Sequence, residues 1–136
     1  MKIDPRLAEE GAATADLPLC RVLLRNEARF PWLVLVPRRV GVREVMDLLP
    51  GDRAAFWRDV ERAGDALLAA TGAAKLNVAL FGNMVPQLHA HLVARSPGDA
   101  AWPGSAVGLP REAYASPPAF WPDLLSRLAL SERQRP

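Results

Sequence analysis

The segment Gln87-Leu-His-Ala-His-Leu-Val-Ala-Arg95 contains both histidines of this 136-residue chain. Alternate side chains of a strand share one face, so Gln87, His89 and His91 are predicted to point the same way. The opposite face is purely apolar, which predicts that it packs into a core: Leu88, Ala90, Leu92 and Ala94. Two imidazoles beside an amide on one strand face indicate a site of chemistry.

The histidine pair allows three interpretations. The imidazoles can be structural groups that only hydrogen-bond to their neighbours. They can chelate zinc, iron or manganese, although the chain has no third histidine and the strand predicted at residues 75–81 has no acid. They can also act in catalysis, because a neutral imidazole is nucleophilic near pH 7 and divides a phosphoryl or nucleotidyl transfer into two easier steps. That chemistry needs an acceptor for the second ring nitrogen and donors for the phosphate oxygens.

Apolar runs on the N-terminal side of this segment predict three further strands. Residues 19–24 and 32–36 are rich in Val and Leu and are separated by a polar spacer, which is typical of an antiparallel pair. Residues 75–81 are predicted to pair with the histidine strand across a tight connection at residues 82–86. The stretch 11–16 is expected to be a loose segment.

One long helix is predicted between the two strand pairs. Apolar residues recur at spacings of three and four from Phe56 to Ala70, Pro50 suits the first turn, and Gly72 ends the pattern. Short helices are expected at residues 5–10 and around residues 124–128. Four strands flanked by one long helix predict the α+β fold class.

The composition predicts one globular domain over residues 1–136, because 50% of the chain is hydrophobic and 24% is charged. The net charge is only +2, and no run of Lys and Arg resembles a nucleic-acid-binding arm. The sole cysteine, Cys20, excludes an intramolecular disulfide and is expected to be a buried structural thiol. The N-terminus lacks the apolar core of a signal peptide and no apolar run could span a bilayer, so a cytoplasmic location without membrane contact is expected.

Arginine recurs at six positions between residues 21 and 43. Two interpretations remain open, namely contacts to a small anionic ligand and solvated strand ends or loops. The six positions are Arg21, Arg25, Arg29, Arg38, Arg39 and Arg43.

The histidine segment resembles the signature of the histidine triad (HIT) superfamily, in which three histidines alternate with apolar residues and an arginine follows closely. The likeness is to a proteobacterial type with glutamine, Gln87, at the first of the three positions. The resemblance implies that His89 is the nucleophile and that His91 orients it and contacts phosphate. An amide at position 87 can donate and accept hydrogen bonds but cannot supply a titrating proton.

The resemblance covers about residues 19–96. It includes the strand at residues 31–37 that ends in proline, the helix entry at residues 47–50 and the asparagine-bearing strand at residues 76–78. The remaining residues, 97–136, form a proline-rich extension with a short helix. The family likeness implies an antiparallel sheet of about five strands and a homodimer whose sheets join edge to edge.

The resemblance also implies a hydrolase or transferase acting at the α-phosphate of a nucleoside phosphoramidate or dinucleoside polyphosphate, with a purine preferred, through a nucleotidyl-histidine and without metal or cofactor. Asn26 is expected near the ribose and Asn83 near the phosphates. Asn77 and Arg95 either touch the ligand or support the loop and the strand end, and Trp102 is expected to plug the proline-rich loop. The alternatives are a nucleotide-binding module without turnover and a His-x-His metal protein.

Overall fold

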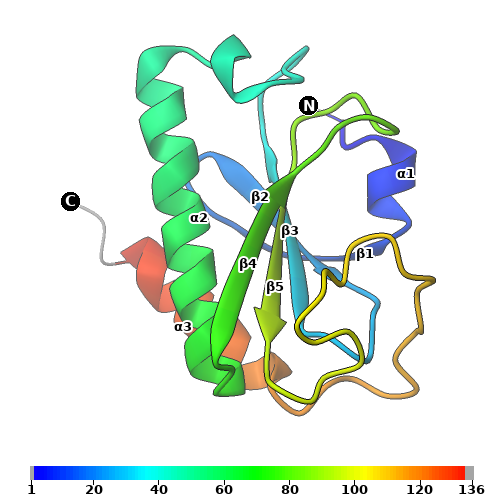
Figure 1. Ribbon diagram of the computed structural model, residues 1–136. Helices are drawn as coiled ribbons and strands as arrows, with labels where there is room; N and C mark the ends of the chain where they lie inside the picture. The colour runs from blue at the N-terminus through cyan, green and yellow to red at the C-terminus, as the bar shows by residue number, and fades with distance from the viewer. Residues whose placement is uncertain (1, 134–136) are drawn as a thin grey trace.

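The structure, a computed structural model that describes residues 2–133, is built on a five-stranded antiparallel sheet in the order β1-β2-β3-β5-β4 (Figure 1). The predicted α+β class and strand number are confirmed. In chain order the elements are α1 (Pro5–Ala8), β1 (Gly11–Asp16), β2 (Cys20–Arg25), β3 (Trp32–Pro37), the 3-10 turn η1 (Val45–Asp47), α2 (Pro50–Thr71), β4 (Lys75–Leu80), β5 (Ala90–Arg95) and α3 (Trp121–Arg133).

Helices α2 and α3 cover one face of the sheet and form the main core with it. The stripe predicted on α2 is buried from Phe56 to Leu67 and partly buried at Ala70. It packs on the apolar face of the histidine strand, whose Ala90 and Leu92 are fully buried. Gly64 allows α2 to lie close to the neighbouring strand β4, since a Cβ at this position would lie 2.7 Å from Cδ2 of Leu76. Gly72 ends the helix in the left-handed conformation, with φ of 67°, as the sequence predicts.

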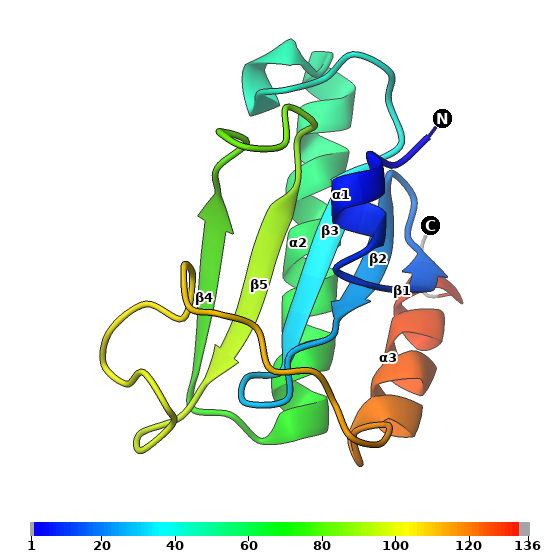
Figure 2. The same ribbon diagram turned by 90° about the vertical axis from the view of Figure 1, so that its right-hand side faces the viewer.

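Helix α1 and the segment after β5 lie over the opposite face of the sheet (Figure 2). They form a second buried cluster, which includes Leu7 of α1, Trp32 of β3, Val93 of β5 and Ala106. His91 belongs to this face, because its register partner across the sheet is Val34 of β3. The histidines are thereby separated from α2 by the thickness of the sheet.

One strand and one strand boundary differ from the sequence prediction. Residues Gly11–Asp16 are not a loose segment but the edge strand β1, which pairs with β2 through a bulge between Ala13 and Ala15. Its Gly, Ala and Thr side chains give no apolar alternation, so only the pairing reveals it. Strand β5 begins at Ala90, so Gln87 and His89 precede the ladder instead of lying within it. Of the C-terminal extension expected at residues 97–136, residues 134–136 lie outside the described residues.

A buried carboxylate joins α2 to the start of β2. Asp59 is completely buried, and its Oδ2 accepts hydrogen bonds from the backbone N–H groups of Leu19, at 2.9 Å, and Cys20, at 2.8 Å. The Cys20 thiol is buried as expected, and burial together with the nearby Asp59 raises its pKa well above its usual range. The cysteine is therefore held as a thiol inside the core.

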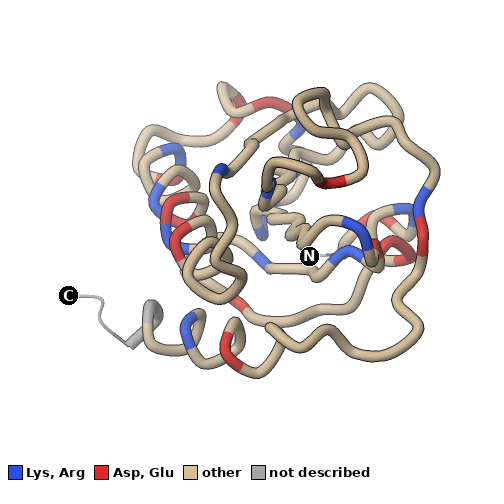
Figure 3. Tube along the Cα trace, turned by 60° about the horizontal axis from the view of Figure 1, so that its bottom comes forward, with Lys and Arg blue, Asp and Glu red and all other residues tan. Residues whose placement is uncertain are grey.

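Basic and acidic side chains alternate along α2, so this helix presents no face of a single sign (Figure 3). Among the described residues, none of the helices combines the length and the apolar character that crossing a bilayer requires.

Candidate functional site

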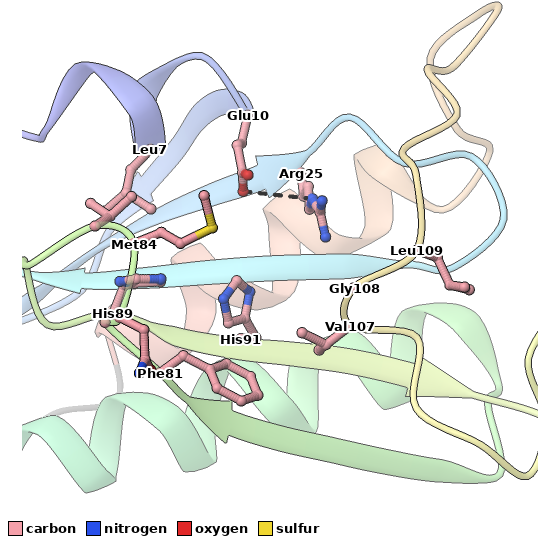
Figure 4. A pocket seen from close by; sticks show the side chains of 13 residues that line it. Leu7, Glu10, Arg25, Phe81, Met84, His89, His91, Val107, Gly108 and Leu109 are labelled. Atoms are coloured by element: carbon pink, nitrogen blue, oxygen red, sulfur yellow. Dashed lines mark ion pairs between the residues drawn. The ribbon is translucent and has the colours of Figure 1, made fainter.

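Both histidines line a hollow of about 440 Å³ on the face of the sheet opposite α2 (Figure 4). Leu7 of α1 forms one wall, and the loop of residues 81–85 between β4 and β5 forms another. The segment of residues 107–109, far along the chain, closes a further side. The lining is mostly apolar, with a small number of polar groups, which is typical of a small-molecule site.

The ring of His89 is held by the backbone just before it. His89 Nδ1 lies 2.7 Å from the carbonyl oxygen of Gln87. A carbonyl oxygen can only accept, so Nδ1 carries the ring proton and donates. In the neutral ring, Nε2 then keeps its lone pair, which is the state that a nucleophile requires.

The ring of His91 is held by a tryptophan on the neighbouring strand. Trp32 Nε1 donates a hydrogen bond of 3.1 Å to His91 Nδ1. An indole nitrogen can only donate, so Nδ1 of His91 is unprotonated and the neutral ring carries its proton on Nε2. The two imidazoles, whose centroids are 5.0 Å apart, thus adopt opposite tautomers. His89 offers a lone pair at Nε2, and His91 offers an N–H donor at Nε2.

The environment keeps His91 uncharged at neutral pH. Burial lowers the pKa of His91 to about 4, and the nearby His89 and the Arg25 cation contribute to the shift. A proton added at Nδ1 would also face the Trp32 N–H and remove their hydrogen bond. His91 is therefore a neutral donor across the physiological range.

This buried histidine predicts a pH-dependent stability. An unfolded-state histidine has a pKa of 6.5, whereas His91 in the folded protein has a pKa of about 4. Between these two pH values the unfolded state therefore binds more protons than the folded state. The free energy of unfolding is therefore expected to fall by up to about 3 kcal/mol as the pH drops through this window. Urea denaturation at several pH values measures it. In His91→Gln the amide oxygen can still accept the hydrogen bond from Trp32, but the pH-dependent contribution of His91 to stability should vanish. If the pH profile of the variant equals that of the wild type, the prediction is contradicted.

Gln87 does not share the hollow with the imidazoles. Its side-chain Oε1 accepts a 2.8 Å hydrogen bond from the backbone N–H of Asp4, and its Nε2 donates one of 3.1 Å to the carbonyl of Lys2. It lines a separate, shallower hollow with these N-terminal residues. The residue at the first triad position thus contacts His89 through its backbone carbonyl, while its amide fastens the N-terminal segment.

Of the other four residues predicted for the site, the structure brings only Asn83 to the hollow. Asn26 Oδ1 accepts from the backbone N–H of Tyr114 at 2.9 Å, which ties the C-terminal segment to the end of β2. Asn77 Oδ1 accepts a hydrogen bond of 3.0 Å from Nη1 of Arg95, so the two side chains stabilise the end of β5 that lies away from the histidines. Trp102 also lies there, with the Arg95 guanidinium 5.9 Å from its ring, rather than over the histidines.

Three residues of the hollow and its surroundings were not assigned to the site from the sequence, although Arg25 was among the arginines considered for an anionic ligand. Arg25 lines the hollow and stacks 4.0 Å over the ring of Trp32, and Glu10 lines the same side. Trp32 fixes the tautomer of His91. The recurrence of arginines was a weak signal for Arg25, but the role of Trp32 depends on a cross-strand register that the sequence does not provide.

Comparisons with known proteins identify the family of the chain. The family model described as HIT domain matches residues 8–98. Among crystal structures, the histidine triad protein of Bradyrhizobium japonicum is 38% identical with a TM-score of 0.87, covering 96% of this chain and 97% of that one. That of Sinorhizobium meliloti is 37% identical with a TM-score of 0.85, covering 96% of each. That of Marinobacter aquaeolei is 34% identical with a TM-score of 0.86, covering 98% and 96%. No curated protein sequence matches the chain. The chain therefore belongs to the HIT domain family.

Proposed function

We propose that this protein hydrolyses or transfers nucleotides at the α-phosphate through a nucleotidyl-histidine on His89. The observation that carries the proposal is the pair of opposite tautomers, which places a lone pair and an N–H donor side by side in one hollow. A nucleophile and a donor to a phosphate oxygen are the two groups that such a transfer needs.

In the first step, Nε2 of His89 attacks the α-phosphorus, a phosphorus–nitrogen bond forms, and the bond to the leaving group breaks. The leaving group departs with the electron pair and takes a proton from water. His91 donates its Nε2 proton in a hydrogen bond to a non-bridging oxygen, and Asn83 lies in the same hollow. Water then attacks phosphorus, breaks the phosphorus–nitrogen bond and releases the nucleoside monophosphate, which restores His89.

The predicted substrates are a nucleoside phosphoramidate and a dinucleoside polyphosphate, with a purine base. Leu7, Val107 and Leu109 give the hollow apolar walls against which a purine can pack. Incubating the protein with adenosine phosphoramidate and with diadenosine tetraphosphate, and quantifying AMP by chromatography, tests the proposal. Release of AMP from either compound supports the proposal. If the protein binds AMP but releases none from either compound, the proposal of catalysis is overturned.

A nucleotide-binding module without turnover is the second candidate. The observation that favours it is the orientation of Gln87, because the first triad position supplies no titrating group and its amide is bound to the N-terminal segment. Calorimetric titration with AMP, beside the hydrolysis assay, separates the two candidates. Binding without AMP release would establish the module.

We also propose a homodimer joined along β4, which forms one edge of the sheet. Val78 on this strand is 43% exposed, and Trp57 on the adjoining helix α2 is 45% exposed. An uncovered edge with exposed apolar side chains is a surface on which a second sheet can pair. Light scattering should give the mass of a dimer for the wild type and for Val40→Lys, a matched exposed valine away from β4. It should give a monomer for Val78→Lys, and three identical masses would contradict this interface.

A further inference from the structure

The guanidinium of Arg25 is an incompletely bonded cation inside the hollow. Its side chain is only 14% exposed, and its Nε is buried without a hydrogen-bond acceptor among the described residues. The nearest carboxylate oxygen, Oε2 of Glu10, lies 3.6 Å from Nε, beyond hydrogen-bond distance. Stacking on Trp32 positions the guanidinium plane but satisfies none of its N–H groups. A desolvated guanidinium of this kind is stabilised by an anion that reaches its donors.

Charged groups of both signs lie around Arg25. Arg111, from the C-terminal segment, is close enough that its charge acts with burial to lower the pKa of Arg25. Two carboxylates oppose this effect, those of Glu10 and Glu27. Glu27 already accepts from the side chain of Arg29 at 2.8 Å and from its backbone N–H at 2.6 Å. Glu10 is thus the carboxylate with which an incoming anion competes for Arg25.

The sheet register places Arg25 beyond His91 when viewed from His89. Arg25 and Trp32 lie at the level of Val93, which is two residues, or about 7 Å, along the strand from His91. Figure 4 shows the same order, with His91 between His89 and Arg25. The hollow thus has room for a nucleotide that places its α-phosphate at His89 and a more distant part of the molecule at Arg25.

We propose that Arg25 forms a second anion subsite, which takes a phosphate group of the substrate that is separate from the α-phosphate at His89. The inference rests on the proposed nucleotide site but not on turnover. The preferred ligands are nucleotides with two well-separated phosphates. The second phosphate has two possible sources, the sugar of the same nucleotide or the far part of a polyphosphate chain.

Calorimetry tests the subsite with AMP, with adenosine bisphosphate carrying phosphates on both the 3′ and 5′ hydroxyls, and with diadenosine tetraphosphate. The wild type should bind at least one of the two larger ligands at least about tenfold more tightly than AMP, and Arg25→Ala should remove that difference while changing AMP affinity less than about twofold. A gain for the bisphosphate alone places the second phosphate on the sugar, and a gain for the tetraphosphate alone places it in the chain.

Three further variants separate the subsite from a structural role. Arg25→Lys keeps the charge without the guanidinium fork, so part of the gain should remain. Glu10→Gln removes the competing carboxylate, so the gain should increase. Arg39→Ala, which removes an exposed arginine paired with Asp52 elsewhere, should change nothing. Equal weakening of AMP and the larger ligands in Arg25→Ala, or no gain in the wild type, would overturn the subsite. Tight binding of a larger ligand without hydrolysis would support the Arg25 subsite and refute only the proposed turnover.

Discussion

Replacement of His89 by alanine is expected to lower kcat for AMP release by about ten-thousand-fold or more, because it removes the atom that attacks phosphorus. His89 lines the hollow and is 6% exposed, and its only side-chain hydrogen bond among the described residues is to the Gln87 carbonyl. The folded structure should therefore survive the change. The measurement is single-turnover hydrolysis of adenosine phosphoramidate by wild type and variant, with circular dichroism to confirm folding.

Two controls distinguish a nucleophile from a residue that only binds. His89→Gly, with free imidazole added to the assay, should recover part of the lost rate, because the small ring can enter the vacated space. His91→Gln should lose only about a hundred- to a thousand-fold, the usual cost of one donor to a phosphate-like oxyanion. Full activity in both His89→Ala and His89→Asn would refute the nucleophile assignment.

The second large effect is expected at the other end of β5, where Asp99→Ala should lower the free energy of unfolding by about 3–5 kcal/mol. Asp99 accepts from Nε of Arg95 at 2.8 Å and from its Nη2 at 2.9 Å, and the Arg95 side chain is only 2% exposed. Asp99 also accepts from the backbone N–H groups of Ser96, Ala101 and Trp102. These bonds hold the pKa of the Asp99 carboxyl well below its usual range. Without the carboxylate, the buried guanidinium keeps only the Asn77 oxygen as an acceptor, and the turn loses the acceptor of its N–H groups.

Equilibrium urea denaturation measures this effect against a matched pair. Arg39 and Asp52 form the same two-bond ion pair, with distances of 2.8 and 3.1 Å, but the Arg39 side chain is 47% exposed. Asp52→Ala should therefore cost at most about 1 kcal/mol. Adding Arg95→Met to Asp99→Ala should recover part of the loss, because it removes the uncompensated charge. Equal destabilisation by Asp99→Ala and Asp52→Ala would contradict this account of the buried pair.

Much of the fold follows from patterns that the sequence carries locally. The apolar spacing from Phe56 to Ala70, with Pro50 before it and Gly72 after it, gives the extent of α2 to within a residue. The alternation on the histidine strand correctly predicts that Ala90 and Leu92 face the core. Strand β1 was missed because its small side chains carry no such pattern, and it exists through its pairing with β2.

The site was less predictable, because its geometry depends on contacts between distant parts of the chain. The motif brings His89 and His91 together, and the alternation suggested that Gln87 would join them. The N-terminal segment instead holds the Gln87 amide, through bonds that span more than eighty residues of sequence. Asn26 and Arg95 are likewise engaged by the segment that follows β5. Only the Arg95–Asp99 pair is local in sequence, and the other partners depend on contacts that local spacing does not reveal.

The proposed mechanism requires that the nucleotide becomes covalently attached to His89. The protein is mixed rapidly with adenosine phosphoramidate, quenched in base, where a phosphorus–nitrogen bond to histidine persists, and digested with trypsin. Cleavage after Lys75 and Arg95 gives one peptide that carries both histidines, and fragmentation in the mass spectrometer then assigns the adduct to one of them. The predicted result is an adenylyl group on His89 that disappears in His89→Asn. An adduct on His91 alone, or turnover with no adduct at any time, would contradict the mechanism.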